Sequence, residues 1–413
     1  MGVITDLHIH SRYSRACSKD LSIKNLEKWA KIKGVDVLGT GDFTHPEWLK
    51  ELKDELVEDE TGILRTKTGF PFMLTVEISQ IYTDVKGRRI HNVITAPNFD
   101  VVDQITAYFL THGRIDYDGR PIFKIPCPDL IENMRSISKD IEVIPAHVWT
   151  PWFSLFGSKS GFDSVEEAFK DQAKHIHALE TGLSSDPDMN RTISNLDKYN
   201  LVSFSDSHSF WPWRLGREAT IFDVELKYKN FLKALRTGKG LSKTIEVDPN
   251  YGKYHVDGHR ACGVIMEPNE SKKNDNICPV CKKELTLGVL HRVEALADRE
   301  EPINIPDFIR LLPLSEIIST VIGKNLSTKS VWDIYWPLIT KFGNEYKILL
   351  EAPLEELDKV VDRKIANAII LNREGKISVT PGYDGIYGVP NLNKHNEAKI
   401  EVKKKQKDLA EFF

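Results

Sequence analysis

Short apolar runs alternate with amphipathic stretches along the first 240 or so residues of the chain. In residues 22–34, "SIKNLEKWAKIKG", apolar positions recur at helical spacing and Gly34 follows the last of them, which predicts a helix ending at that glycine. Seven other runs predict strands: "GVITDLHI", "VDVLGTGD", "PFMLTVEIS", "IHNVITA", "IEVIPAH", "HALETG" and "LVSFSD". Strands that alternate with helices indicate an α/β fold around a mostly parallel sheet or barrel.

The pattern changes after this first region. Residues 245–300 are rich in Gly, Asn, Lys and Cys, residues 302–373 have the apolar spacing of helices broken by prolines, and "GKISVTPGYDGIYGVPNL" is a Gly- and Tyr-rich loop. We therefore expect an α/β domain at 1–243, a small metal-stapled module at 244–300, a helical contact or packing domain at 301–392, and a flexible basic tail at 393–413.

Composition is that of an ordinary globular protein: 413 residues, 41% hydrophobic and 28% charged, with a formal charge of -4. With no overall basic excess, contact with nucleic acid has to come from local patches. No long apolar segment predicts a membrane span, so we expect a cytoplasmic, nucleoid-associated protein with no membrane partner, and a monomer. A scarcity of Gln beside many Lys and Glu favours a thermophile.

Histidines and acids collect at the ends of the predicted strands, where α/β folds place active sites. Neutral imidazoles and carboxylates suit Zn, Mn or Fe, and a carboxylate such as Glu77 can bridge two ions that act together on a phosphate ester. For any one of these histidines a structural role remains the alternative. The predicted metal-binding residues are His8, His10, Asp42, His45, Glu77, His91, His147, Asp206 and His208, with Glu77, Asp206 and His208 as the catalytic set.

Aromatic and basic residues near these positions are candidates for a substrate pocket. Tryptophans beside the metal-binding residues would stack a base extruded from a duplex, or would simply pack there. Arginines nearby would contact phosphates or remain solvated, and tyrosines of the Gly-rich loop would stack or wedge. The candidates are Trp149, Trp152, Glu180 (a further ligand or base), Trp211, Trp213, Arg214, Arg217, Tyr383 and Tyr387.

Cysteine spacing in the second region predicts a structural zinc site. Two pairs, His259-x2-Cys262 and Cys278-x2-Cys281, have the spacing of two zinc knuckles, and "CPVC" followed by "KKELT" is typical of a zinc ribbon. The fourth ligand is open at this point, because His255 or His291 could replace His259. A closed four-ligand site staples a module too small to build its own core.

The C-terminal tail carries the pattern Q-x-x-L-x-x-F-F in Gln406, Leu409, Phe412 and Phe413. One helical turn would bring the leucine and the aromatic pair to one face, as a plug for a hydrophobic pocket. The pattern resembles the peptide (PIP box) by which replication and repair proteins bind the ring-shaped sliding clamp (PCNA), and the alternative is a frayed terminus.

Four motifs together resemble the PHP (polymerase and histidinol phosphatase) superfamily of metal phosphoesterases. They are "DLHIHSRYS", "GTGDFTH", the acid Glu77 and "FSDSH". The resemblance implies a distorted seven-stranded β/α barrel that holds two or three metals. His8, His10, Glu77 and Asp206 would bind the first, Glu77, His91 and His147 the second, and Asp42, His45 and His208 would lie toward a third. The chain has "RAC" where many members carry a further ligand, and there Cys17 is the available donor.

The whole combination, which spans essentially the full chain, resembles the archaeal endonuclease Q family. That resemblance implies a DNA repair endonuclease that nicks double-stranded DNA on the 5′ side of uracil, hypoxanthine, xanthine and abasic sites. It also implies zinc in the catalytic site, with manganese or magnesium as alternatives, and one structural zinc. Two other functions stay open: a small-molecule phosphatase of the histidinol-phosphate type, and a non-catalytic clamp-bound scaffold.

Overall fold

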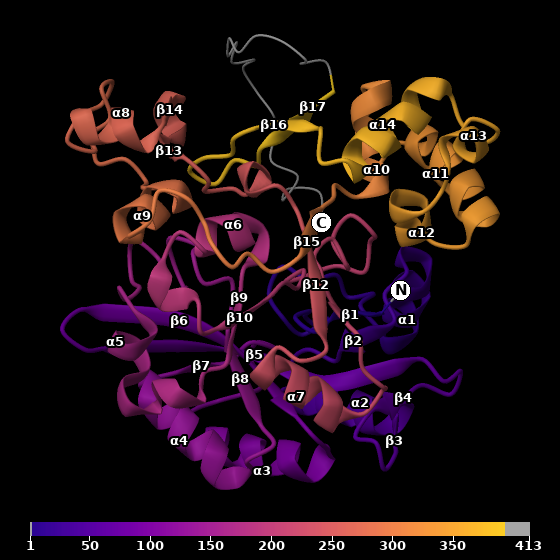
Figure 1. Ribbon diagram of the computed structural model, residues 1–413. Helices are drawn as coiled ribbons and strands as arrows, with labels where there is room; N and C mark the ends of the chain where they lie inside the picture. The colour runs from indigo at the N-terminus through magenta and orange to yellow at the C-terminus, as the bar shows by residue number, and fades with distance from the viewer. Residues whose placement is uncertain (1, 393–413) are drawn as a thin grey trace.

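The computed structural model describes residues 2–392, so the clamp-peptide residues Gln406, Leu409, Phe412 and Phe413 lie outside the described part of the chain. The fold is mixed α/β, as predicted (Figure 1). The strands are β1 (Val3–Asp6), β2 (Val37–Gly39), β3 (Val57–Glu58), β4 (Leu64–Arg65), β5 (Pro71–Thr83), β6 (Gly87–Ala96), β7 (Ile122–Phe123), β8 (Glu142–Pro145), β9 (Ala178–Glu180), β10 (Asn200–Val202), β11 (Ala219–Phe222), β12 (Leu241–Glu246), β13 (Asp257–His259), β14 (Val264–Met266), β15 (Phe308–Arg310), β16 (Ser378–Thr380) and β17 (Val389–Asn391).

Helices flank the sheet and build the C-terminal part of the chain. They are α1 (Ile23–Lys33), α2 (Pro46–Glu55), α3 (Phe99–Leu110), α4 (Cys127–Ile137), α5 (Val165–Phe169), α6 (Pro187–Asn190), α7 (Tyr228–Thr237), α8 (Pro268–Lys273), α9 (Val289–Leu296), α10 (Leu314–Ile322), α11 (Lys329–Phe342), α12 (Glu345–Leu350), α13 (Leu354–Leu357) and α14 (Arg363–Arg373). None of the helices in the described residues is long and apolar enough to cross a membrane.

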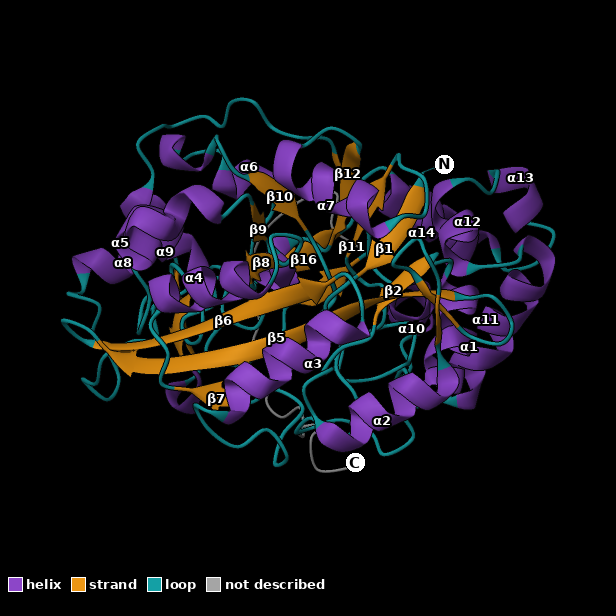
Figure 2. Ribbon diagram, turned by 90° about the horizontal axis from the view of Figure 1, so that it is seen from below, coloured by secondary structure: helices purple, strands orange, loops and turns teal. Residues whose placement is uncertain are grey.

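The main sheet is mixed, so the prediction of a mostly parallel sheet is wrong. Its order is β15-β12-β11-β1-β2-β5-β4-β3, with β6 paired to β5 and β8, and β7 paired to β5. Only the pairs β1–β2, β2–β5, β5–β7 and β12–β15 are parallel. The long strands β5 and β6 form an antiparallel hairpin (Figure 2), because the tight connection at 84–86 leaves no room for a crossover helix.

Strand β9 pairs in parallel with β10 in a separate two-stranded sheet. All seven apolar runs predicted as strands overlap a strand of the structure. The closed seven-stranded barrel stays a prediction.

The first helix shows why the local predictions succeed. Ser22 caps α1 by accepting a hydrogen bond from the Asn25 N–H, and Gly34 ends the helix in the left-handed conformation with φ of 96°. Between these caps, Leu26 and Trp29 point into the core. In both views α1 lies near β1 and β2, next to the C-terminal helices (Figures 1 and 2).

Segments that follow the predicted first domain also contribute to the main sheet or lie above it. The predicted boundary at residue 243 falls inside β12, and β15 lies at the edge of the main sheet although it comes after the Cys-rich segment. Hairpin β13–β14 and helices α8 and α9 lie on one side of the upper half in Figure 1, and helices α10–α14 lie on the other. The small hairpin β16–β17 lies between these two groups.

Candidate metal centre

A first group of potential ligands joins the ends of β1 and β10 to the middle of β5. His8, His10, Glu77 and Asp206 each offer one donor atom, and these atoms all lie within 4.8 Å of one another. The loops after β1 and β10 are held together by the hydrogen bond from His10 N–H to the Ser207 carbonyl, at 2.9 Å. His10 Nε2 lies 3.1 Å from Asp206 Oδ1. The sequence-predicted first site is therefore brought together in space.

A second group shares Glu77 with the first. Glu77 Oε1 lies 2.7 Å from His91 Nδ1 and 3.1 Å from His147 Nε2. Strand β5 runs to Thr83 and β6 begins at Gly87, so Glu77 and His91 lie inside long strands rather than at their ends. Their side chains meet because β5 and β6 are adjacent in the sheet. With one carboxylate common to both groups, the arrangement has the geometry of a two-metal site.

Two buried acids orient the imidazoles from behind. Glu180 Oε2 lies 2.9 Å from His8 Nδ1 and also accepts the His147 N–H at 3.0 Å. Asp42 Oδ1 lies 3.0 Å from His10 Nδ1. A carboxylate that accepts from Nδ1 fixes the tautomer and leaves Nε2 free to bind a metal. Glu180 and Asp42 therefore contact the ligand imidazoles from their Nδ1 side, and neither belongs to a group of potential metal ligands among residues 2–392. The predicted roles of Glu180 in the pocket and of Asp42 toward a third metal stay predictions.

Three of the predicted residues have backbone angles in the left-handed region. The φ angles are 48° for Asp42, 31° for His147 and 46° for Asp206. Non-glycine residues in this region are uncommon, and each is held there by the surrounding structure. The three residues follow the ends of β2, β8 and β10 by two to four positions, so each lies in the loop after a strand.

The charges of the cluster favour a cation. Burial alone would raise the pKa of Glu77, but the positive charges of His91 and Arg120 lower it well below its usual range. Burial would likewise lower the pKa of His8, yet the charges of Glu180 and Glu77 raise it well above its ordinary value. Positive charge is therefore stabilised at His8, whereas burial lowers the pKa of His91 and that of His208 to about 4.

The donor set fits a transition metal. His8 Nε2 is buried without a hydrogen-bond partner, and it lies 3.6 Å from Glu77 Oε1. A buried polar atom without a partner is costly unless something binds it. Imidazoles and carboxylates are the ligands that Zn, Mn and Fe accept. The residues present therefore fit one ion in each group.

Two predicted histidines lie beside these groups but outside them. The His208 ring is 4.3 Å from that of His10, and its Nδ1 lies 3.7 Å from Asp206 Oδ1. The His45 ring stacks on Tyr13 at 4.3 Å and precedes α2. Neither residue joins a group of potential ligands among residues 2–392. A third metal bound by Asp42, His45 and His208 thus stays a prediction, because these three residues form no group of potential ligands among residues 2–392.

The four predicted tryptophans differ in their surroundings. Trp149 is 1% exposed and donates its indole N–H to Asn190 Oδ1, so it packs in the core and cannot stack an incoming base. Trp152 is half-buried against Tyr254. Trp211 and Trp213 are also half-buried, and their rings stack 5.1 Å apart at 11°. The Trp211 ring also packs against those of Trp29, Phe210 and Trp332, at centroid distances of 4.9, 5.2 and 5.8 Å, so it takes part in an aromatic cluster with α1 and α11.

The predicted arginines and tyrosines of the pocket also differ in their surroundings. Arg217 is buried and donates to the Ser205 carbonyl at 3.0 Å, so it supports the loop before Asp206 and is not free to bind phosphate. Arg214 donates to the Tyr387 hydroxyl at 3.2 Å. Burial alone would raise the pKa of Tyr387, but the neighbouring cations, Arg214 first among them, lower it to about 8. Tyr383 is buried and packs against the backbone at Gly258.

The Cys-rich segment forms a second, separate ligand cluster. His259, Cys262, Cys278 and Cys281 offer donor atoms within 4.8 Å of one another. The alternatives for the fourth ligand lie elsewhere: His291 Nδ1 is 2.6 Å from Asp257 Oδ2, and His255 is buried. Three thiols and one imidazole are a donor set typical of structural zinc.

The turn that carries two of these cysteines favours the thiolate. Cys278 N–H donates to the Lys283 carbonyl at 2.8 Å, which closes a tight turn over Cys278–Cys281. Burial would raise the pKa of the Cys278 thiol, but hydrogen bonds from the backbone N–H groups of Cys281 and Val280 lower it to about 6. The backbone is thus arranged to hold negative sulfur, the form that binds metal.

One charged residue of the centre has no place in the sequence prediction. Arg120 Nη1 lies 2.9 Å from Glu77 Oε2. It comes from the loop before β7, in "YDGRP", which follows no predicted strand and contains no histidine. Its basic character alone does not distinguish it from the other arginines and lysines of the chain, so no sequence feature pointed to it.

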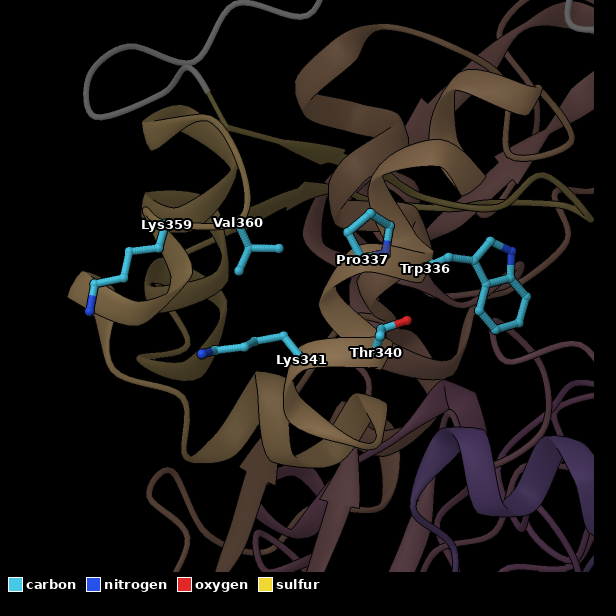
Figure 3. A pocket seen from close by; sticks show the side chains of 6 residues that line it. All are labelled: Trp336, Pro337, Thr340, Lys341, Lys359 and Val360. Atoms are coloured by element: carbon cyan, nitrogen blue, oxygen red, sulfur yellow. The ribbon is translucent and has the colours of Figure 1, made fainter.

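A surface hollow of about 750 Å³ lies on the helical part of the chain (Figure 3). It is lined by residues of α11 and of the segment after α13: Trp336, Pro337, Thr340, Lys341, Lys359 and Val360. Pro337 and Val360 face each other across it, with Lys341 and Lys359 at its edge. The hollow shares no residue with the candidate metal groups.

Comparison with known proteins finds a matching family model and two related proteins, one much longer than this chain and one of similar length. A family model, the MJ0043 C-terminal domain, matches residues 313–376. The MJ0043 protein of Methanocaldococcus jannaschii is 37% identical over 248 residues, which cover 58% of this chain but only 31% of that protein. The YqxK protein of Bacillus subtilis is 30% identical over 409 residues, which cover 94% of this chain and 98% of the relative.

Two solved structures resemble nearly the whole chain. One is the lesion-specific endonuclease PfuEndoQ from Pyrococcus furiosus, with a TM-score of 0.85, 32% identity and coverage of 95% of this chain and 96% of that one. The other is an endonuclease Q in complex with a 27-mer duplex that has an abasic lesion at the active site. It has a TM-score of 0.86, 33% identity and coverage of 97% and 99%.

Proposed function

The chain belongs to the endonuclease Q family, and from this premise we propose that it is a metal-dependent DNA repair endonuclease. Its substrate would be a duplex with a deaminated base (uracil, hypoxanthine or xanthine) or an abasic site, and it would cut the phosphodiester bond on the 5′ side of the lesion. The observation that carries the proposal is the pair of buried ligand groups that share Glu77. The near full-length likeness to an endonuclease Q bound to a lesion-containing duplex supports the choice of DNA as substrate.

The side chains divide into ligands and supports. His8, His10, Glu77 and Asp206 would hold one ion, and Glu77, His91 and His147 the other. A pair of divalent ions in these places supplies the charge that activates a water molecule and stabilises the attacking and leaving oxygens of an in-line displacement.

The supports fix where the ligands point. Glu180 and Asp42 hold the rings of His8 and His10 from their Nδ1 atoms. His147 Nδ1 lies 3.1 Å from Ser154 Oγ, so its Nε2 is directed at Glu77. Ligands locked in this way need little rearrangement when an ion binds, which favours both affinity and catalysis.

The DNA would meet half-buried aromatic residues that are neighbours of the ligand residues in the sequence. Trp211 and Trp213 follow Asp206 and His208 in the chain and stack on each other. Stacking on indole rings is the contact that a base displaced from a duplex can make whatever its sequence. We propose that this pair, together with Trp152, borders the place where the damaged nucleotide is held.

The test uses labelled duplexes that carry uracil, hypoxanthine, an abasic site or normal bases, incubated with Mg²⁺, Mn²⁺ or Zn²⁺. We expect a single nick 5′ of each lesion and none in the normal duplex. Asp206→Asn should abolish nicking while leaving the circular dichroism spectrum unchanged. Equal cleavage of all duplexes would refute lesion specificity, and hydrolysis of histidinol phosphate without nicking would identify a small-molecule phosphatase instead.

We also propose recruitment by a sliding clamp through Gln406, Leu409, Phe412 and Phe413. Leucine and paired phenylalanines are suitable anchors for a hydrophobic pocket. Replacing both phenylalanines by alanine should abolish clamp binding in a pull-down with the purified clamp and leave the intrinsic nicking rate unchanged. Clamp binding that survives the double substitution would exclude this peptide as the anchor.

A further inference from the structure

The guanidinium of Arg120 reaches into the candidate metal centre. Its Nη1 lies 2.9 Å from Glu77 Oε2, and the same oxygen lies 3.3 Å from His10 Nε2. The Arg120 side chain is 25% exposed, so part of it is accessible to solvent while Nη1 contacts the carboxylate. A guanidinium keeps its charge at any ordinary pH. Arg120 and an ion in the first group therefore compete for the same carboxylate oxygen.

The main chain on either side of Arg120 is fixed. The Gly119 N–H donates to the Tyr13 carbonyl at 3.0 Å, and the Pro121 carbonyl accepts the Ser79 N–H at 2.9 Å. These bonds attach the loop to the segment after β1 and to β5, which both carry ligands. Arg120 can thus change partners by side-chain rotation alone, without movement of the loop.

Few other partners are available to this guanidinium. The other carboxylates whose charge acts on Arg120 are Asp206, a member of the first group, and Asp118. Asp118 Oδ2 is already paired with Arg15 Nε at 3.3 Å, and its Oδ1 accepts backbone N–H groups. A guanidinium released from Glu77 would therefore be a charged, partly exposed donor beside the place where a phosphate would bind.

We propose that Arg120 is a phosphate-binding catalytic residue, which leaves Glu77 when the ligand groups are filled and then binds a non-bridging oxygen of the scissile phosphodiester. This inference rests on the proposed phosphodiester hydrolysis. Two parallel N–H groups of a guanidinium fit phosphate oxygens, and negative charge grows on those oxygens as the bond to the leaving group breaks. In the metal-free protein, the same residue keeps Glu77 neutralised and in place.

The test compares Arg120→Met with the wild type in two measurements. Mn²⁺ affinity is measured by titration of protein freed of loosely held metal, with zinc content checked so that the Cys-rich site stays loaded. We expect Arg120→Met to bind Mn²⁺ about tenfold more tightly, because a charged hydrogen bond to Glu77 no longer competes. At saturating Mn²⁺, its single-turnover nicking of an abasic duplex should be about 100-fold slower.

Two further variants separate the proposal from a merely structural role. Arg120→Lys keeps the charge without the planar donors and should nick at an intermediate rate. Arg114→Met removes a 74% exposed guanidinium of the same loop, which pairs with Asp116, and should match the wild type in both measurements. Weaker or unchanged Mn²⁺ binding by Arg120→Met, or nicking at the wild-type rate, would overturn the proposal. If the wild type nicks no duplex, the proposed function and the phosphate role both fail, while tighter Mn²⁺ binding would still establish the competition for Glu77.

Discussion

A buried ion pair joins the first helix of the chain to the C-terminal helices, and its removal provides the sharpest test of the fold. Lys33 Nζ in α1 lies 2.6 Å from Glu345 Oε1 in α12 and donates to the Pro212 carbonyl at 2.8 Å. The side chains are 1% and 0% exposed. Glu345 also accepts from Leu314 N–H at 3.0 Å and from the Tyr335 hydroxyl at 2.8 Å. Every polar atom of the pair thus has a partner within the protein.

The expected effect of Lys33→Met follows from this burial. The substitution leaves Glu345 as a buried charge with two neutral donors, and breaking a buried pair in this way costs about 3–5 kcal/mol. That is a large part of the roughly 5–15 kcal/mol by which a domain is stable. Adding Glu345→Gln removes the unpaired charge, so the double variant should recover about 2 kcal/mol relative to Lys33→Met.

Urea unfolding followed by tryptophan fluorescence measures these differences. The Trp332 ring lies 5.0 Å from the Tyr335 ring, so the emission reports on this part of the fold. Lys31→Met is the matched control on the same helix. Lys31 is 51% exposed and pairs with Glu27 four residues earlier, so its loss should cost about 0.5 kcal/mol or less. A Lys33→Met variant as stable as this control, or a double variant less stable than Lys33→Met, would refute the reasoning.

Two further predictions concern pH and the Cys-rich site. Burial raises the pKa of Glu246 to about 8 from an ordinary value of 4.5, so its stabilising contribution is complete below about pH 4.5 and is lost as the pH rises toward 8. Glu246→Gln, which stays neutral, should therefore lose less unfolding free energy than the wild type between about pH 5 and 8, by up to about 1.4 kcal/mol per pH unit; parallel stability curves would contradict this. Cys278→Ser should lower bound zinc by one equivalent per chain and expose the 245–300 segment to limited proteolysis, and full zinc content in the variant would rule out Cys278 as a ligand.

The parts of the fold and site that sequence predicts are those set by local pattern. The helix ending at Gly34 and the strands before His8, His147 and Asp206 follow from apolar spacing and from capping, which act over a few residues. Their histidines and acids converge because the loops that follow these strands are neighbours, as the hydrogen bond from His10 N–H to the Ser207 carbonyl shows. The Cys-x2-Cys knuckle can be predicted because its two cysteines are close together in the sequence.

What sequence did not predict depends on contacts between distant segments. Glu180 contacts His8 Nδ1 and accepts a hydrogen bond from the His147 backbone N–H. Nothing in the local sequence distinguishes such a supporting residue from a direct metal ligand. Trp149 was placed in the pocket because of its neighbour His147, yet its indole turns into the core toward Asn190. Arg120 reaches Glu77 across 43 positions of sequence, and only the folded loop brings the two together.

The backbone of Asp206 determines which inactive variant is useful for structural work. With φ of 46°, this position suits aspartate or asparagine, whose short side chains tolerate the left-handed region, whereas an alanine there carries roughly 1–2 kcal/mol of strain. An alanine variant would therefore combine a misplaced loop with a missing ligand, and its inactivity would have two causes. The asparagine variant changes one atom and keeps the turn, so it is the form in which to crystallise the uncut duplex and see where the damaged nucleotide lies.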